Sequence, residues 1–451
     1  MMSFPTLAHH VVTTTLFREV GVGTTIERFS CVLMLVAGLS AAPSGPARGD
    51  TISAEVVRLG TLDGINSEAH GVSDGAVVVG SSCCALLVTE NQDMPAFRWT
   101  VAGDMSDLGV LLGGDSSVAN AVSADGSVVV GYSYVGGRSV EDTTPTHAFR
   151  WTQAGGMADL GVLPGDSSSS ANAVSADGST VVGMSEVEGS NGAVSLHAFR
   201  WTQAGGMIDL GTLGGKKAAA HGVSADGSVV VGESGAEPEG TDHAFRWTQA
   251  GGMADLGVLP GDSSSMANAV SADGLVVVGY SYSAKADAAH AFRWTEADGM
   301  IDLGVPPGAR SSVANAVSAD GSVIVGDSTE QPGGPTHPFR WTQAEGIKDL
   351  KKLLVDAGIN MTGINLDSAE AVSENGKYIV GEGVFDLSGF FVEDRRSAYG
   401  EGYIVCYGIE GCGSVAKVRD CAGGSDDTPP ACRADRAPRD QELHRVGLHR
   451  Q

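Results

Sequence analysis

The stretch from His147 to Gly183 reads HAFRWTQAGGMADLGVLPGDSSSSANAVSADGSTVVG, and nearly all of residues 56–393 consists of copies of it. Each copy contains Phe-Arg-Trp, and this marker uses all six tryptophans of the chain: Trp99, Trp151, Trp201, Trp247, Trp294 and Trp341. Successive tryptophans are roughly 46 to 52 residues apart, a period typical of propellers and similar arrays.

A second marker, Val-Ser-x-Asp-Gly followed by a β-branched run and a glycine, occurs between the tryptophans. It is found at 122–131, 174–183, 223–232, 270–279 and 317–326, with looser versions at 72–80 and 372–381. Because β-branched and aromatic clusters alternate with Gly, Asp and Ser, each unit is predicted to form four short strands. In one unit we expect strands at 171–175, 180–184, 197–202 and 207–212. No apolar period of 3.6 residues predicts a helix, so the repeats should be all-β.

A charge pair accompanies every Phe-Arg-Trp marker. A two-residue turn at Ala-Gly would place its arginine opposite the aspartate of the following Asp-Leu, which would stabilise the hairpin by roughly 0.2 to 1 kcal/mol. The pairs are Arg98 and Asp107, Arg150 and Asp159, Arg200 and Asp209, Arg246 and Asp255, Arg293 and Asp302, and Arg340 and Asp349. We interpret these pairs as structural.

Counting strands by type predicts a closed ring. Fourth-strand sequences number seven if 57–62 is included, and so do the first hairpins, so an early fourth strand complements a last unit that lacks one. We predict a seven-bladed β-propeller of about 47-residue four-stranded repeats, closed by this N-terminal strand. The third strand of the last blade is either 389–393 (GFFVE) or 402–407 (GYIVCY), and Arg58 stands where other copies have Asp. A linear β-solenoid is the rival architecture.

His-Ala-Phe-Arg-Trp followed by Asp-Leu-Gly and Ala-Val-Ser-x-Asp-Gly resembles the HAF-repeat family of bacterial extracellular repeat proteins. The resemblance covers the repeats alone. It implies an exported or surface location and, in some relatives, a passenger region ahead of an autotransporter barrel. It implies no activity that can be assigned to particular residues.

Residues 1–50 form a leader outside the repeats, which we place at 51–407. Within the leader, 29–42 (FSCVLMLVAGLSAA) follows Arg28 and precedes small residues and Pro, which is typical of a secretory signal removed near Ala42 or Ala47. The run is shorter than the roughly 20 residues of a transmembrane helix. A buried strand or helix is the alternative interpretation.

Residues 408–451 differ in composition from the repeats. They are rich in Gly, Asp, Pro and Arg without apolar periodicity, so we predict a disordered tail. A frameshifted or truncated end is one hypothesis for it. Four cysteines at or beyond the end of the repeats could form two disulfides in an oxidising compartment: Cys406, Cys412, Cys421 and Cys432.

Composition and motifs argue against several functions. A net charge of −26 disfavours nucleic acid and anionic membranes as partners. No Gly-x-Ser-x-Gly, His-Glu-x-x-His, phosphate loop or complete calcium loop is present, so we expect no cofactor, no metal and no catalytic residue. The histidines of His-Ala-Phe should lie on third strands, too far apart to converge on a metal: His147, His197, His243, His290 and His337.

One ring of polar residues is the candidate binding site. The second residue of each predicted first strand is polar, and these residues should surround the mouth of the central channel: His70, Asn120, Asn172, His221, Asn268, Asn315 and Glu370. They could bind a polar ligand or cation, or they could cap backbone groups. The variable loops 132–146, 185–196, 233–242 and 163–170 should emerge on the same face.

Three functions fit these features. The first is an exported, non-catalytic and monomeric repeat protein that binds a protein or glycan through its loop face. The second is a propeller enzyme, a lyase or hydrolase acting on extracellular sugars or lactones through the polar ring and a bound cation. The third is a structural spacer on the cell surface. Metal analysis separates the first two, and the effect of loop substitutions on adhesion separates the third.

Overall fold

The computed structural model describes residues 56–62, 66–83, 94–136, 144–188, 194–236 and 240–385, and the backbone of short strands at 32–34 and 403–404. Within these ranges the chain is β-structure with a single short helix. Six antiparallel units of four strands follow one another along the sequence, and a less regular sheet comes last. The predicted all-β class and four-stranded unit are confirmed for this part of the chain.

The bounds of the strands follow the repeat. The first sheet contains β3 (Asn66–Val72), β4 (Val78–Cys83), β5 (Ala96–Thr100) and β6 (Asp104–Asp107). The second contains β7 (Ser117–Val122), β8 (Val128–Tyr134), β9 (Thr146–Thr152) and β10 (Gly156–Asp159). The third contains β11 (Ser168–Val174), β12 (Thr180–Glu188), β13 (Val194–Thr202) and β14 (Gly206–Asp209).

The next three sheets repeat the pattern. The fourth contains β15 (Gly214–Val223), β16 (Val229–Ala236), β17 (Thr241–Thr248) and β18 (Gly252–Asp255). The fifth contains β19 (Ser264–Val270), β20 (Val277–Ser283), β21 (Ala288–Thr295) and β22 (Gly299–Gly304). The sixth contains β23 (Ser311–Val317), β24 (Val323–Thr329), β25 (Thr336–Thr342) and β26 (Gly346–Asp349). A parallel bridge between Leu196 and Lys217 joins the third sheet to the fourth.

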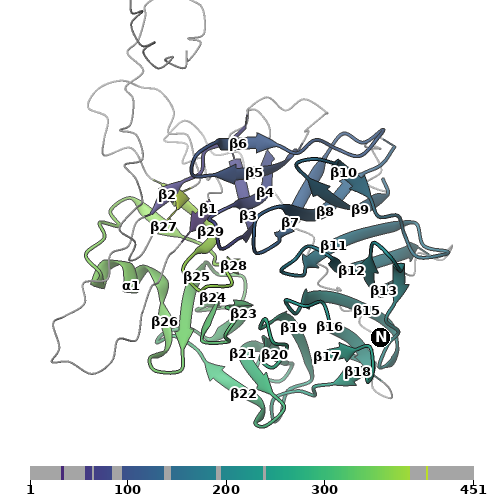
Figure 1. The fold of residues 1–451 in the computed structure, drawn as a ribbon. Coiled ribbons are helices and arrows are strands. Elements are labelled where there is room, and N and C mark those ends of the chain that lie inside the picture. Colours follow the sequence, from purple (N-terminus) through teal and green to yellow (C-terminus); the bar gives the residue numbers. More distant parts are fainter. Residues whose placement is uncertain are drawn as a thin grey trace, which may run out of the picture. The chain divides into compact units, whose positions relative to one another are not determined.

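The first strand of each sheet is the innermost one. In Figure 1 the first strands of successive sheets lie side by side around a common centre, with the later strands of each sheet farther out. In the last sheet β28 (Ala371–Val372) contacts both β23 and β3. This arrangement is consistent with a β-propeller, and sheets of four strands do not fit the linear solenoid.

A β-bulge interrupts every regular first strand at the same place. In the second sheet Ala119 pairs with Gly131 and Ala121 with Val130, so Asn120 is the extra residue. A bulge brings the inner backbone close to its partner strand. A methyl group on Gly131 would overlap the carbonyl oxygen of Val118, and the glycines that end the other β-branched runs meet the same obstacle. The recurring glycine of the second marker is therefore required by the bulge.

The core lies between neighbouring sheets. One cluster joins Val182 and Ala198 of the third sheet to Ala220, Val230 and Phe245 of the fourth. The phenylalanine of each Phe-Arg-Trp is fully buried: Phe97, Phe149, Phe199, Phe245, Phe292 and Phe339. Each unit therefore needs its neighbours to cover its apolar side chains, which is the reason for a repeated array.

The predicted arginine–aspartate pairs are wrong. Thr152 pairs with Gly156, so the turn between the third and fourth strands has three residues instead of two, and Arg150 lies opposite Ala158. Asp159 lies opposite Phe149. The same register occurs in all six sheets. The Arg150 Nε instead donates to the Gly178 carbonyl in the turn of the next sheet, 3.1 Å away.

The last sheet departs from the repeat. Helix α1 (Leu350–Asp356) follows β26, which corrects the expectation of a helix-free repeat region. Asp349 caps it by accepting a hydrogen bond from the Lys352 amide, and Leu350 and Leu354 are buried. Beyond it, β27 (Ile364–Leu366) and β28 both pair with β29 (Ile379–Phe385).

Segments from both ends of the chain complete this region. The other edge of β29 pairs with β1 (Val32–Met34), while β2 (Val57–Arg58) pairs with β30 (Tyr403–Ile404). The leader segment predicted as a secretory signal thus contributes a strand here, which is the alternative interpretation of that run. Of the two proposed third strands, 403–404 pairs with the N-terminal strand, and 389–393 lies outside the described residues.

Residues 57–62 lie where the last sheet meets the first. Leu59 belongs to a buried cluster with Val78 of the first sheet and Val380 of the last. The Ser67 hydroxyl donates to the Gly60 carbonyl at 2.8 Å, and Ser82 Oγ accepts from the Leu62 amide at 3.1 Å. The predicted domain boundaries at 50 and 407 fall outside the described residues and stay predictions.

Candidate functional site

Six of the seven residues of the predicted polar ring are the bulge residues of the inner strands, and the seventh, Glu370, directly precedes β28. Because a bulge turns its extra side chain out of the sheet, each of these side chains can reach the neighbouring sheet. Five of them contact the backbone carbonyl of the residue before the next bulge. The contacts are His70 Nδ1 to Ala119 O at 2.9 Å, Asn120 Nδ2 to Ala171 O at 2.8 Å, Asn172 Nδ2 to Ala220 O at 2.9 Å, Asn268 Nδ2 to Ala314 O at 2.8 Å and Asn315 Nδ2 to Ala369 O at 3.0 Å.

The structure therefore brings the ring together as a chain of contacts from sheet to sheet. Since a carbonyl only accepts, Nδ1 of His70 carries the proton in this contact. Glu370 directly precedes β28, and its amide donates to the Val380 carbonyl at 2.8 Å. His221 Nε2 lies 3.9 Å from Glu233 Oε1. Hydrogen bonding to backbone matches the capping interpretation of the ring, and ligand binding by it stays a prediction.

Acidic groups gather where the sixth, last and first sheets meet. Asp327 of β24 accepts hydrogen bonds from Asn315 Nδ2 at 2.8 Å and from the Ala369 amide at 2.9 Å. His70 Nε2 lies 3.8 Å from Glu68 Oε2 on the same strand. We call Glu68, His70, Asp327, Glu370 and Glu382 the seam cluster.

The pKa is raised for three members of the seam cluster: His70, Asp327 and Glu382. Burial, together with the charges of Glu68 and Glu370, raises the pKa of Glu382 to about 7. Burial and the charge of Glu370 raise the pKa of Asp327 well above its ordinary value, although two hydrogen bonds oppose this. Burial would lower the pKa of His70, but Glu68, the Ala119 carbonyl and Glu370 raise it overall.

The Ser-Ala-Asp-Gly turns are hairpin turns, as predicted. Asp177 Oδ1 accepts from the Ser175 hydroxyl at 2.7 Å and from the Ser179 amide at 2.9 Å, and Gly178 has a φ of 71°. The hydrogen bond from Ser175 is the main reason why the pKa of Asp177 is lowered. The Asp177 carboxylate is therefore hydrogen-bonded within its own turn.

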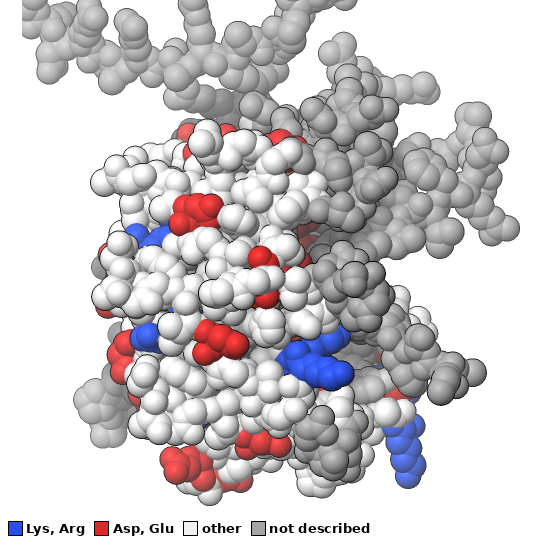
Figure 2. All heavy atoms as spheres, turned by 90° about the vertical axis from the view of Figure 1, so that its right-hand side faces the viewer, with Lys and Arg blue, Asp and Glu red and all other residues white. Residues whose placement is uncertain are grey.

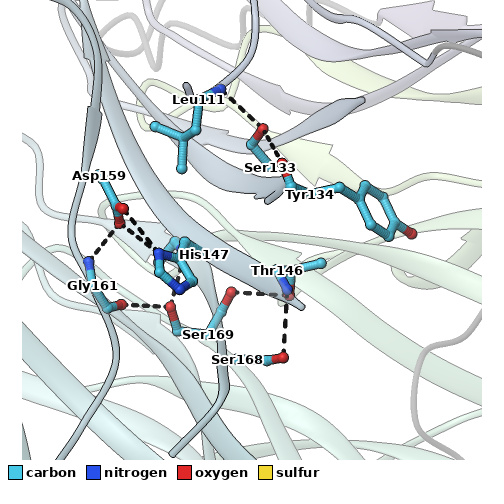
Figure 3. Close-up of polar contacts among 10 residues, drawn as sticks. Leu111, Ser133, Tyr134, Thr146, His147, Asp159, Gly161, Ser168 and Ser169 are labelled. Atoms are coloured by element: carbon cyan, nitrogen blue, oxygen red, sulfur yellow. Dashed lines mark hydrogen bonds and ion pairs between the residues drawn. The ribbon is translucent and has the colours of Figure 1, made fainter. Parts of the chain in front are cut away.

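The five histidines that precede the Phe-Arg-Trp marker lie on the third strands, and four of them pair with carboxylates, of which His197 pairs with Asp166. His147 Nδ1 lies 2.9 Å from Asp159 Oδ2, and Asp159 Oδ1 accepts from the Gly161 amide at 2.7 Å (Figure 3). His243 with Asp255 and His290 with Asp302 repeat this pair. The aspartate that sequence reasoning assigned to arginine is thus a partner of histidine, and each pair serves its own sheet.

Buried serines link the sheets, and sequence reasoning treated them only as loop residues. Ser169 Oγ accepts from the Ala148 amide at 2.8 Å and donates to the Gly161 carbonyl at 2.6 Å. It joins β11 to β9 and to the chain that follows β10 (Figure 3). Ser133 Oγ likewise accepts from the Leu111 amide at 3.1 Å. The Ser-Ser that recurs at the start of the first strand in four units was the signal that could have predicted the links made by Ser169 and its equivalents.

The predicted loop face is only partly described. Much of the predicted loops is strand, because β8 continues to Tyr134, β12 to Glu188 and β16 to Ala236. Their tips at 137–143, 189–193 and 237–239 lie outside the described residues. On the loop between β6 and β7, Leu112 is fully exposed. Charges on the side shown in Figure 2 are spread out, and acidic groups outnumber basic ones there.

A small cavity lies between the third and fourth sheets. Leu196, Lys217, Glu233 and Asp242 are among the residues that line it, and its volume of about 20 Å³ suits a single water molecule. Nearby, burial and the charges of Glu233 and Asp242 raise the pKa of Tyr280 to about 12. This cavity does not suit a sugar or peptide.

Neither a metal centre nor a membrane-spanning helix is found in the described ranges. Nowhere in them do three His, Cys, Asp or Glu side chains lie in an arrangement that could hold a metal ion. The same residues contain no helix of the length and apolarity that crossing a bilayer requires.

Comparison with known proteins gives only distant likenesses. No protein-family model and no curated protein matches the chain. TolB from Acinetobacter baumannii is 11% identical with a TM-score of 0.42, over 74% of this chain and 67% of that one. An oligogalacturonate lyase in complex with manganese is 11% identical with a TM-score of 0.41, over 75% and 92%. A putative TolB from Agrobacterium tumefaciens is 12% identical with a TM-score of 0.40, over 59% and 88%.

Proposed function

We propose that this chain is an exported, non-catalytic propeller that binds a protein or glycan through its loop face. The observation that carries the proposal is the set of contacts made by the six bulge side chains of the first strands. Five of these six side chains contact the backbone of the next sheet, so the inner strands build a rigid scaffold. Rigid scaffolds typically bind partners through the loops they present.

Within this proposal the ring has seven blades and is closed by residues 57–62. In the turn between the first and second strands of each regular sheet, a backbone amide donates to a carbonyl in the same turn of the next sheet. The series runs from the Asp74 amide and the Ala124 carbonyl to the Ala319 amide and the Glu374 carbonyl. Between the last and first sheets, the Asn375 amide donates to Asp74 Oδ1 at 2.7 Å. The Ser67 bond to Gly60 repeats the Ser169 bond to Gly161, which supports Gly60 as part of a fourth strand that covers the first blade.

Export is proposed from the signal-like leader and from the resemblance to the HAF-repeat family. The pairing of β1 with β29 is the competing reading of this segment, because a cleaved signal cannot remain in the sheet. Cell fractionation followed by mass measurement of the recovered chain distinguishes the two. A chain that starts after Ala42 or Ala47 supports export, and a retained leader contradicts it.

Two exposed leucines provide the test of the loop face. Leu112 lies between a fourth and a first strand, on the proposed binding face. Leu275, 55% exposed, lies in the turn between β19 and β20, on the opposite face of an up-and-down sheet. We expect Leu112→Ser to reduce binding at least about tenfold, the effect of losing about 1.4 kcal/mol of contact energy. Leu275→Ser should leave binding unchanged.

The measurement starts from a glycan array and from affinity capture on immobilised surface proteins, followed by titration of the strongest binder. Both variants remove one exposed leucine, so they share any general effect of lost apolar surface. Equal binding by the two variants and the unsubstituted chain would contradict the loop-face proposal.

A propeller enzyme is the second candidate, because the seam cluster combines buried carboxyl groups with a histidine. A lyase or hydrolase needs an acid and a base in reach of the substrate. Turnover of oligosaccharides or lactones that is lost in Glu382→Gln, together with a metal found by elemental analysis, would favour it over the binding protein.

A further inference from the structure

The seam cluster is a local departure from the repeat. The residue after the bulge-facing glycine occupies the same position in every sheet: Ser81, Tyr132, Met184, Glu233, Tyr280, Asp327 and Glu382. At this position the sixth sheet has Asp327, the last sheet has Glu382 and the fourth sheet has Glu233, whereas the other four sheets have neutral residues. The sixth and last sheets thus contribute acids to one junction, where most other junctions have neutral residues.

Asp327 connects the sixth sheet to the last one through its carboxylate. Its two oxygens accept from Asn315 of β23 and from the Ala369 amide just before β28. Its carboxylate faces Glu370 and Glu382, which belong to the last sheet. When the Asp327 carboxyl group carries a proton, it no longer repels the charges of Glu370 and Glu382.

The first sheet supplies the other side of the seam. Glu382 faces Glu68 and His70 of β3, and also Glu370 and Asp367 of its own sheet. His70 faces Glu68 and Glu370 and bonds to Ala119 of the second sheet. Five carboxyl groups thus lie near one another, with His70 as the basic group that faces them: Glu68, Asp327, Asp367, Glu370 and Glu382.

We propose that the seam between the last sheet and its two neighbours is a proton-dependent latch, closed at acidic pH and loosened at alkaline pH. It rests on the closed ring proposed above and on the pairing of β1 with β29, in which Val32 lies opposite Glu382, so the chain tested keeps its leader. It is independent of what the loop face binds. At low pH Asp327 and Glu382 carry protons, and His70 carries a positive charge 3.8 Å from Glu68. At high pH several like charges remain close together in a buried site.

The sign follows from linkage. Groups whose pKa is raised in the folded state bind more protons there than in the unfolded chain, so stability falls as pH rises. For Glu382 the loss begins above its ordinary pKa of 4.5 and is complete above about 7. The raised pKa of His70 has the same sign, because its favourable charge is lost on deprotonation.

The test is amide hydrogen exchange of the full chain at pH 5 and pH 8, corrected for the intrinsic pH dependence of exchange. Protection of β28 and β29 should fall at least about tenfold at pH 8, since one pKa unit corresponds to a tenfold change in an equilibrium. Protection of β15 and β16, away from the seam, is the internal reference. Glu382→Gln should remove most of the fall and raise protection at pH 8.

Glu233→Gln is the matched control, because it removes the same charge from the same position of the fourth sheet. It should leave the pH dependence of β28 and β29 unchanged. Asp327→Asn is the second variant, in case Glu382→Gln fails to fold, and it should also flatten the dependence. Equal changes in the seam and the reference strands, or an unchanged dependence in the folded variants, would overturn the latch.

Failure of the closed ring gives a different result. The Asn375 amide, which donates to Asp74 across the junction, would then exchange freely at pH 5 as well as at pH 8. Protection of this amide at pH 5 with no pH dependence at β28 and β29 would retain the ring and refute the latch.

Discussion

At the scale of single residues, the glycine that ends each β-branched run is the most constrained position of the repeat. A methyl group at Gly131 would overlap the Val118 carbonyl, whereas one at Gly161 would meet open space but sit at a φ of 73°. We expect Gly131→Ala to destabilise the fold by about 3 kcal/mol, because backbone must move. Gly161→Ala should cost only about 1 kcal/mol.

Urea denaturation followed by far-ultraviolet circular dichroism compares the two variants. A smaller loss for Gly131→Ala than for Gly161→Ala would show that the inner bulge is absent or easily relaxed. Both substitutions add one methyl group, so side-chain size does not explain a difference.

The sequence predicted this glycine as the end of a strand but not its reason. Periodicity locates strands, whereas a bulge depends on how two strands pair, which single-strand patterns do not encode. The structure places Asn120 at the bulge of β7, and its contact with Ala171 of the next sheet could not be predicted. That contact depends on the angle and distance between sheets.

At the scale of elements, register was the least predictable quantity. The choice of a two-residue turn, where the structure has three residues, shifted every arginine by one position relative to its aspartate. Because side chains alternate between the two faces of a strand, an error of one residue exchanges every partner. The arginine then reaches the neighbouring sheet and the aspartate pairs with histidine.

The links between sheets depend on buried serines, and Ser169 offers a test. Ser169→Ala would leave the Ala148 amide and the Gly161 carbonyl without their shared partner, which costs about 1 to 3 kcal/mol in a buried site. Ser167→Ala, two residues earlier and exposed, should cost less than about 0.5 kcal/mol. Urea midpoints measure both, and equal midpoints would contradict the role of serine as an intersheet link.

At the scale of the whole molecule, the number of repeats was the strongest sequence evidence for the architecture. The copies predicted repeated four-stranded sheets, because each copy carries its own turns and core residues, and six regular sheets follow one another in the described residues. The last sheet was the weakest part of the prediction. Its strands come from divergent segments and from the leader, β2 and β30 form a separate two-stranded sheet, and α1 replaces the usual connection.

The stability of the repeated sheets against acid depends on the turn aspartates, with a sign opposite to that of the proposed latch. The pKa of five of them is lowered, and in four a hydrogen bond from a neighbouring serine is the main cause: Asp125, Asp177, Asp226 and Asp273. A lowered folded pKa means that the unfolded chain binds more protons, so their stabilisation is present above the ordinary pKa of 3.8 and is lost as pH falls through the folded values.

We therefore expect the melting temperature to fall below about pH 4, and to fall again as pH rises from about 4.5 to 7, where Glu382 deprotonates. Changing all four aspartates to asparagine should flatten the acid limb, because the amide oxygen still accepts the turn hydrogen bonds without a titrating group. The control variant changes four exposed acids to their amides: Glu296, Asp298, Glu330 and Asp356. Differential scanning calorimetry between pH 3 and pH 5 compares the two. An acid limb that persists in the turn variant but disappears in the control would assign acid sensitivity to the general surface charge.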